Sequence, residues 1–183
     1  MLETRPQIIK NQAVVANHWA LLRLEEGDDA ASINVPDGSV IVPLAVWQAQ
    51  RASLAQRPQL GLWLASSAQA SDIAADLSHF AVIAIDFPKF SDGRGFSIAY
   101  NLRRRLGYTG EIRAIGDVLR DQLFYMKRVG FDAWEVRADK DIQDALKGLS
   151  VFSETYQDSL DQKQPLFRRT ERGHVTTVGQ ANP

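Results

Sequence analysis

The sequence contains no cysteine and only three histidines among its 183 residues. The absence of cysteine excludes disulfide bonds, thiol redox chemistry and cysteine-ligated zinc sites or iron–sulfur clusters in this chain. The histidines, His18, His79 and His174, are far apart in the sequence. We therefore expect no metal site.

Long apolar runs are missing as well. Residues 58–71 form one of the longest uncharged stretches, which is too short and too polar to span a bilayer. The first ten residues include Glu3, Arg5 and Pro6 and lack the apolar core of a signal peptide. These absences favour a cytoplasmic protein that does not bind a membrane.

The residues that are present have the composition of one globular domain, with 45% hydrophobic and 23% charged residues. The net charge of −1 does not favour nucleic acid as a partner. However, residues 88–129 carry 9 basic and 4 acidic side chains, a net charge of +5, whereas residues 1–87 carry 5 and 9, a net charge of −4. This positive window favours an anionic small molecule or an acidic protein surface as the partner.

Strand and helix patterns alternate from residue 39 onward. The predicted strands are short apolar runs at residues 40–42, 60–64, 81–85, 111–115 and 133–136. Helical spacing of apolar residues follows each strand, at residues 44–55, 71–77, 95–106, 117–129 and 141–156. Five such repeats predict an α/β fold with a mostly parallel sheet and helices on both faces. The alternative is a partial β/α barrel, because a complete eight-fold barrel needs roughly 250 residues.

The two ends of the chain differ from this pattern. We expect residues 1–38 to form an N-terminal arm that contains a strand or a hairpin, and residues 39–157 to form a single α/β domain. Residues 158–183 lack periodicity and end in small polar residues, which predicts a flexible tail.

The most informative stretch, residues 86–97, follows the most apolar strand and opens a helix. In open α/β sheets, ligands bind beyond the carboxyl ends of the strands. Two glycines allow the backbone to approach a ligand closely, and the start of the helix offers unpaired N–H groups. The sequence therefore predicts an anion site formed by Lys89, Gly93, Arg94, Gly95 and Ser97. The alternative is a simple strand-to-helix turn.

The same stretch does not predict a particular cofactor. A dinucleotide fingerprint needs a third small residue, but Gly93-Arg94-Gly95 is followed by Phe96, Ser97 and Ile98. A Walker motif is also absent. The identity of any cofactor is left open.

Three carboxylates follow or flank the predicted strand ends. Asp86, Asp92 and Asp117 are candidate catalytic residues, because paired carboxylates perform acid–base chemistry or hold Mg²⁺. The alternative is that they cap helices and anchor loops.

A second candidate surface lies on the helix predicted at residues 117–129. Arg120, Asp121, Phe124 and Arg128 recur at helical spacing, so they share one face. A large apolar side chain among charges suggests a docking face for a protein partner. The alternative is a solvated face with Asp–Arg pairs worth about 0.3–0.5 kcal/mol each.

Four segments resemble a bacterial family that is known as domain of unknown function 934. They are DFPKFSDGRGFS (residues 86–97), RLGY (105–108), GDVLRDQL (116–123) and GFDA (130–133). The similarity covers residues 40–157 and is densest from 82 to 137. It implies an oxidoreductase involved in sulfite reduction, a description that rests largely on genes beside those for sulfite reductase and sulfate-assimilation enzymes. The resemblance supplies no catalytic residues.

Two functional hypotheses follow. The first is an accessory protein of assimilatory sulfite reduction that binds the reductase, another sulfate-assimilation protein or a small anion such as sulfite through the loop around Lys89 and Arg94. The second is an enzyme, either an oxidoreductase or an acid–base catalyst, that acts on a small anionic substrate through the strand-end aspartates. A purely structural interaction module is a third reading of the same residues.

Overall fold

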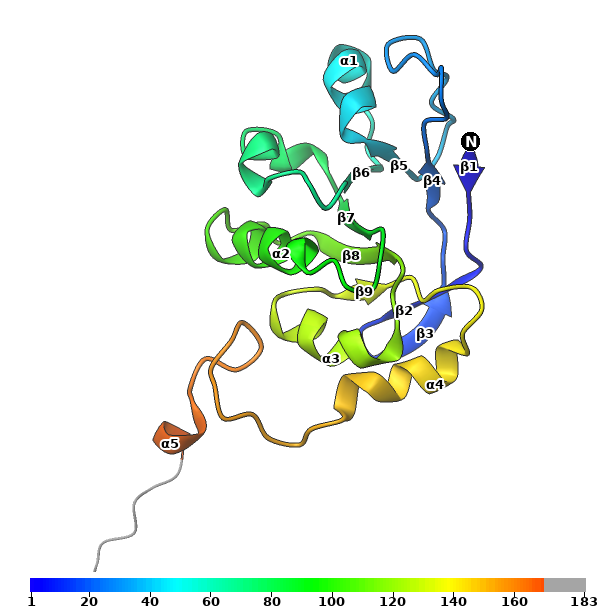
Figure 1. Cartoon of the computed structure of the whole chain (residues 1–183). Coiled ribbons are helices and arrows are strands. Elements are labelled where there is room, and N and C mark those ends of the chain that lie inside the picture. Colours follow the sequence, from blue (N-terminus) through cyan, green and yellow to red (C-terminus); the bar gives the residue numbers. More distant parts are fainter. Residues whose placement is uncertain (170–183) are drawn as a thin grey trace, which may run out of the picture.

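The computed structural model describes residues 1–169, in which nine strands form one sheet in the order β1-β4-β5-β6-β7-β8-β9-β2-β3. The sheet curls into a half-barrel, as Figure 1 shows. The strands are β1 (Leu2–Glu3), β2 (Gln7–Lys10), β3 (Ala13–Ala16), β4 (Ala20–Leu22), β5 (Val40–Pro43), β6 (Leu60–Leu64), β7 (Val82–Phe87), β8 (Glu111–Gly116) and β9 (Ala133–Trp134). The described helices are α1 (Leu44–Leu54), α2 (Arg94–Arg104), α3 (Arg120–Arg128), α4 (Ile142–Leu146) and α5 (Leu166–Arg169), with 3₁₀ helices η1 (Ala70–Ile73), η2 (Leu77–His79) and η3 (Lys147–Ser150).

The sheet is mixed, so the prediction of a mostly parallel sheet is wrong. Strands β4 to β9 run parallel to one another. Strand β1 pairs antiparallel with β4, and β2 pairs antiparallel with both β9 and β3. The prediction missed these pairings because the strands between Leu2 and Leu22 have only two to four residues each, too few for a clear apolar pattern.

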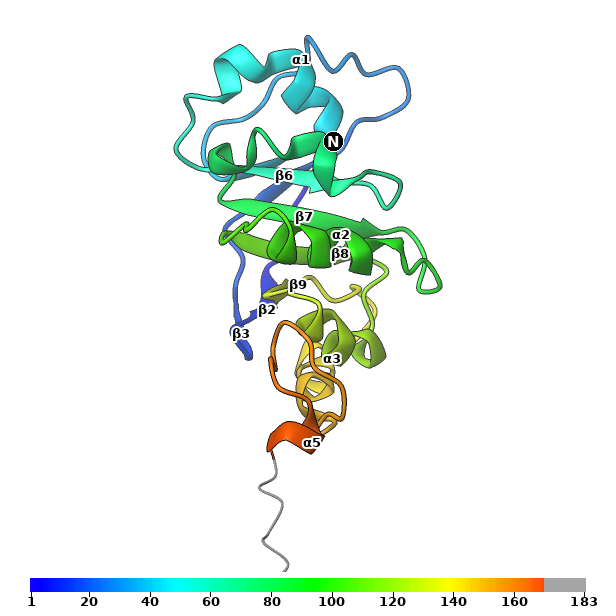
Figure 2. The ribbon, with the colours of Figure 1, turned by 90° about the vertical axis from the view of Figure 1, so that its left-hand side faces the viewer.

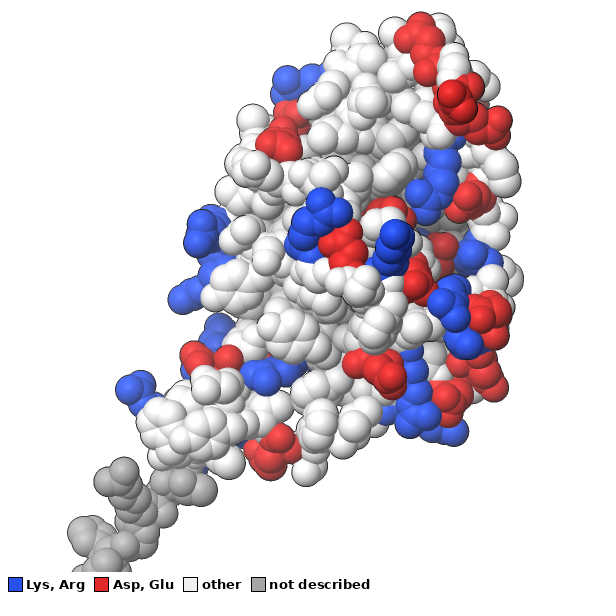
Figure 3. All heavy atoms as spheres, in the orientation of Figure 1, with Lys and Arg blue, Asp and Glu red and all other residues white. Residues whose placement is uncertain are grey.

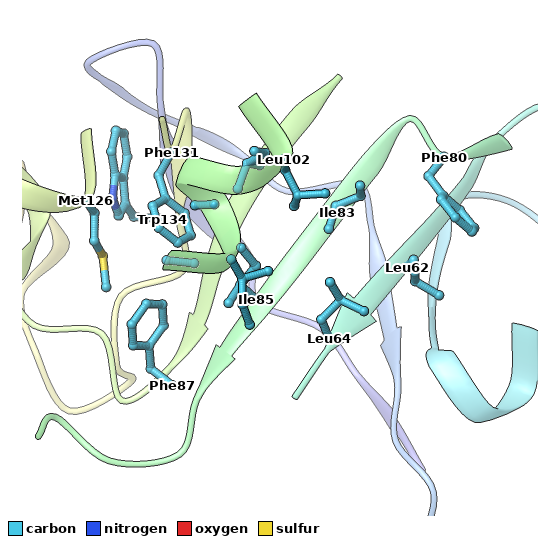
Figure 4. Packing of buried hydrophobic residues seen from close by; sticks show 14 of the residues in the cluster. Leu62, Leu64, Phe80, Ile83, Ile85, Phe87, Leu102, Met126, Phe131 and Trp134 are labelled. Carbon is cyan, nitrogen blue, oxygen red and sulfur yellow. The ribbon is translucent and has the colours of Figure 1, made fainter. Parts of the chain in front are cut away.

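Helices α1, α2 and α3 pack on the outer face of the half-barrel, and Figure 2 shows α2 in front of strands β7 and β8. Trp47 of α1, Leu102 of α2 and Met126 of α3 all belong to one large core cluster between these helices and the sheet. Figure 4 shows Met126, Phe87 and Phe131 meeting within this cluster. The smaller cluster on the inner face contains only residues of strands, Leu21, Ile41, Val82, Ala84 and Ile115. For the described residues, the predicted helical cover on both faces is therefore wrong.

The N-terminal residues 1–23, which we call the strap, close the open side of the half-barrel. Strands β1 and β4 lie at one end of the sheet and the β2–β3 hairpin lies at the other. The chain therefore crosses between the two ends twice, at residues 4–6 and 17–19, as Figure 1 shows. The backbone N–H of Asn17 donates to the carbonyl of Pro6 at 3.0 Å and joins the two crossings.

The strap covers a group of charged side chains on the inner face. Arg113 of β8 is only 1% exposed, and its Nε donates to Glu111 at 2.7 Å while its Nη1 donates to Asn17 of the strap at 3.0 Å. Lys10 of the strap lies 2.6 Å from Glu111. Burial raises the pKa of Glu135, although Arg113 and Arg5 lie nearby and lower it. The buried Arg113 is stable here because its guanidinium donates to the carboxylate of Glu111 and the amide oxygen of Asn17.

The helices agree with the predicted ones in position but differ in length. The helix predicted at 141–156 ends its α-helical part at Leu146 and continues only as η3. The helix expected near Ile73 is replaced by η1 and η2. No helix among residues 1–169 is long and apolar enough to cross a membrane. The predicted tail of residues 158–183 lies outside the described residues from 170 onward.

Candidate functional site

The loop between β7 and α2 and the start of α3 meet at one rim of the sheet. The backbone N–H of Asp117 donates to the carbonyl of Phe87 at 2.7 Å, which joins the ends of β7 and β8. The carboxylate of Asp117 accepts from the backbone N–H of Phe90 at 2.8 Å, and the amide of Gln122 donates to the Phe90 carbonyl at 3.1 Å. The rim is thus formed by the carboxyl ends of parallel strands, where ligands bind in open α/β folds.

Asp92 and Arg94 form a tight pair on this rim. The Nε of Arg94 donates to one oxygen of Asp92 at 2.9 Å and its Nη2 donates to the other at 2.7 Å. Ser66, from the loop after β6, donates to Asp92 at 2.7 Å and accepts from Nη2 of Arg94 at 2.8 Å. The bonds from Arg94 and Ser66 hold the pKa of Asp92 far below its usual range. Asp92 is therefore a permanent carboxylate that orients Arg94.

A cleft of about 430 Å³ opens between α2 and the loop that joins β6 to η1. We call it the α2 cleft. Its polar lining includes Ser66, Ser67, Arg94, Ser97, Asn101 and Arg105. No acidic side chain of residues 1–169 lines it. Two guanidinium groups with hydroxyl and amide groups between them form a lining that suits an anion.

The spacing on α2 explains how this helix contributes one side of the α2 cleft. Arg94, Ser97, Asn101 and Arg105 follow at intervals of three, four and four residues, so they share one face. Arg94 and Ser97 are among the residues predicted from the sequence, whereas Asn101 and Arg105 are not, although the same spacing indicates them. Ser66, which lies just after the end of β6, is likewise not among the predicted residues.

The remaining predicted anion-binding residues lie elsewhere. Lys89 is exposed, makes no ion pair with any described residue and does not line the α2 cleft. Gly93 precedes α2 as its N-cap. Gly95 faces the core, where an added Cβ would lie 2.6 Å from the ring of Phe87. This glycine therefore lets α2 pack closely against β7.

The three candidate catalytic aspartates each accept from a different arginine. Arg23 of the strap lies 3.2 Å from Asp86, and Arg137 lies 2.7 Å from Asp117. Asp92 is held by Arg94, as described above. Within residues 1–169, no group of three histidine, aspartate or glutamate side chains is placed to hold a metal ion. The arrangement favours neutralised carboxylates that fix loops over free acid–base groups.

The predicted docking face on α3 contacts the protein's own C-terminal region. Arg120 pairs with Asp144 of α4 at 3.0 Å, and the ring of Phe124 packs against Phe152 with centroids 5.1 Å apart. Arg128 donates to a backbone carbonyl at residue 157 at 2.6 Å. Of the four predicted residues, Arg120 and Asp121 are exposed, and Phe124 and Arg128 are half-buried. Much of this face is thus occupied within the molecule.

The positive window of residues 88–129 is divided among separate places. Arg113 is buried under the strap, Arg94 pairs with Asp92, and Arg120 pairs with Asp144. On the face displayed in Figure 3, basic and acidic side chains accordingly lie next to one another. The basic side chains of this window therefore belong to separate local sites, such as the α2 cleft, and do not form one extended positive surface.

These observations define an α/β half-barrel protein with an anion-compatible cleft between α2 and the loop after β6. A family model matches residues 61–167, and the chain belongs to that family, described as "Bacterial protein of unknown function (DUF934)". No curated protein matched the chain, and no solved structure matched it either.

Proposed function

We propose that this protein is an accessory protein of assimilatory sulfite reduction that binds an oxyanion in the α2 cleft. The observation that carries the proposal is the lining of the cleft, which has two arginines and no acidic side chain among the described residues. The link to sulfite reduction comes from the role described for the family, and the cleft supplies the anion chemistry that such a role requires.

The two arginines would act differently. Arg94 is already oriented by Asp92 and Ser66, and its Nη1 has no hydrogen-bond partner among residues 1–169. Arg105 is exposed and makes no ion pair with any described residue. Because the Asp92–Arg94 pair is neutral as a unit, Arg105 provides the uncompensated positive charge. Arg94 provides a prepositioned donor, which reduces the ordering cost of binding.

The hydroxyl and amide groups complete the proposed site. Ser97 and Asn101 lie between the arginines on the same face of α2 and also line the cleft. Their side chains donate to oxyanion oxygens, and hydrogen bonds to a charged group contribute about 1.5–3 kcal/mol each. The same chemistry would accept an acidic side chain from the reductase, so binding of the ion and binding of the reductase are tested separately.

Calorimetry with sulfite tests the anion site. Arg105→Gln removes the uncompensated charge and should weaken sulfite binding by about tenfold, which corresponds to about 1.4 kcal/mol. The matched control is Arg104→Gln, because Arg104 is its exposed neighbour and does not line the cleft. Equal weakening by both variants, or by neither, would contradict the assignment of the site.

A third variant distinguishes between two candidate anion sites, the β7–α2 loop that the sequence predicts and the α2 cleft. Lys89→Ala should leave sulfite binding unchanged, because Lys89 lies outside the α2 cleft. A loss of binding in Lys89→Ala but not in Arg105→Gln would place the anion at the β7–α2 loop. A pull-down of sulfite reductase with the same variants tests the second half of the proposal, and retention of the reductase by every variant would reject the cleft as its contact.

The alternative is an enzyme that uses Asp86, Asp92 or Asp117 as acid or base. It has less support, because each carboxylate accepts from an arginine and the pKa of Asp92 is held far below neutrality. A general acid or base works best with a pKa near the operating pH. Turnover that is lost in Asp86→Asn and Asp117→Asn proteins would favour this alternative.

A further inference from the structure

The α2 cleft is longer than a single inorganic oxyanion. Arg94 and Arg105, which both line it, are eleven residues apart along α2 and its C-terminal end. At 1.5 Å per residue, this separation corresponds to about 16 Å along the helix axis. A sulfite ion is much shorter than this stretch of the helix and fills only part of the cleft that runs along it. The length of the cleft therefore indicates a larger occupant.

The volume of the cleft leads to the same conclusion. A space of about 430 Å³ lies within the range of about 300–1,000 Å³ that is typical of sites for organic ligands. A sulfite ion would occupy one end and leave the rest of the cleft in water. Binding of so small an ion would use only part of the groups that this cleft presents.

The walls of the α2 cleft are partly apolar. Ile98 and Leu106 line it from α2, and Ala68 and Ala70 line it from the opposite loop. These apolar side chains line the same cleft as the two arginines and the hydroxyl groups. Apolar walls contribute to the free energy of binding only when an apolar part of the ligand covers them and removes them from water. An ion surrounded by water gives no such gain.

We propose that the occupant of the α2 cleft is an organic oxyanion, a molecule that carries a sulfonate or phosphate-ester group on an apolar body. This inference rests on the proposed function, because it specifies the ligand of the same anion site. The anionic group lies against Arg105 and Asn101, because no described carboxylate compensates the charge of Arg105. The apolar body extends along α2 over Ile98. A sulfonate group has the three terminal oxygens of sulfite, so the two ligands compete for the same donors.

A matched series of ligands tests the inference by calorimetry on the full chain. The probes are sulfite, methanesulfonate, benzenesulfonate and the neutral benzenesulfonamide. We expect benzenesulfonate to bind at least tenfold more tightly than methanesulfonate, because it adds an apolar ring to the same anionic group. We expect benzenesulfonamide to bind at least tenfold more weakly than benzenesulfonate, because it keeps the ring and removes the charge.

Variants locate the binding in the cleft. Ala68→Trp fills the apolar wall and should abolish the preference for benzenesulfonate over methanesulfonate, while Arg105→Gln should weaken both ligands. The control is Ala74→Trp, because Ala74 is exposed and does not line the cleft. Ala68→Leu fills the wall with a smaller side chain and replaces Ala68→Trp if that variant does not fold by circular dichroism.

The outcomes separate this inference from the proposed function. Equal affinities for methanesulfonate and benzenesulfonate would overturn the organic body but leave the anion site in place. A preference for benzenesulfonate that survives both Ala68 variants would also overturn the inference, because the ring would then bind outside the cleft. Binding of none of the anions, sulfite included, would overturn the proposed function itself.

Discussion

Gly116 holds the rim of the sheet together, and replacing it with alanine should destabilise the protein. Gly116 is the last residue of β8 and has a φ of +90°, a conformation that L side chains rarely adopt. An added Cβ would lie 2.5 Å from the carbonyl oxygen of Phe87 and 2.9 Å from the carboxylate of Asp86. The Phe87 carbonyl also accepts from Asp117, so it cannot move away without breaking the junction of β7 and β8.

The magnitude follows from a comparison with Gly107. Gly107 also has a positive φ, +67°, but an added Cβ there would meet nothing within 4 Å. Gly107→Ala therefore costs only the left-handed backbone conformation, about 1–2 kcal/mol. Gly116→Ala costs the same amount plus the displacement of packed backbone, about 1–3 kcal/mol more. In a chain of this length, that difference lowers the Tm of Gly116→Ala below that of Gly107→Ala by roughly 2–4 °C per kcal/mol.

Urea unfolding of both variants and the unchanged protein measures the difference. The m values should agree among the three proteins, so that the midpoints report stability alone. A free energy of unfolding for Gly116→Ala within about 0.5 kcal/mol of that for Gly107→Ala would refute the close contact at the rim. Loss of sulfite binding in Gly116→Ala alone would connect the rim to the α2 cleft.

Three further predictions concern charged groups. Glu111→Gln leaves the buried Arg113 without its carboxylate and should lower the free energy of unfolding by about 3–5 kcal/mol in chemical denaturation. Because burial raises the pKa of Glu135, the charged form of this side chain destabilises the folded state above the pKa that glutamate has in the unfolded chain. Glu135→Gln should therefore raise the urea midpoint at pH 7 and leave it unchanged below about pH 4. Arg94 lowers the pKa of Asp92, so the ionised carboxylate stabilises the fold fully above about pH 4, and this stabilisation is lost as the pH falls towards the pKa of the folded state. Between about pH 4 and pH 2, the Asp92→Asn protein should therefore lose less stability than the unchanged protein. An equal loss in both proteins would count against the Asp92–Arg94 pair.

The central strands could be predicted from the sequence because burial acts on them locally. Strand β6 has the predicted bounds Leu60–Leu64, and both of its faces are covered, so the apolar run is continuous. An added Cβ at Gly61 would lie 2.7 Å from Ile41, which explains a glycine inside this strand. The five predicted strand–helix repeats correspond to β5 to β9 for the same reason.

The strap strands could not be assigned in this way because their partners are distant in the sequence. Ile9 of β2 pairs with Trp134 of β9, and Leu2 of β1 pairs with Leu22 of β4. No local pattern encodes such a pairing in strands of two to four residues. Arg113 within an apolar strand was the available sign of an inner face that carries charge.

The candidate site could be predicted in part. The rule that ligands bind beyond the strand ends correctly brought the β7–α2 loop and the start of α3 to one rim, which Phe90 and Asp117 join. The opposite wall of the α2 cleft comes from residues 66–71, whose contribution depends on how η1 packs beside α2. Likewise, the contact between Phe124 and Phe152 depends on the path of the chain after α4, which helical spacing does not describe.

The strap has a consequence for the order in which the molecule assembles. Its residues precede strands β5 to β9 in the sequence, yet β2 can pair with β9 only when β9, more than a hundred residues later, has been made. Such distant pairing slows folding, because a long loop must close before the contact forms. Until then, the growing chain exposes an incomplete sheet with free edges on which other chains can add strands. The strap is thus made before its partner β9 and is among the last parts of the described sheet to take its place.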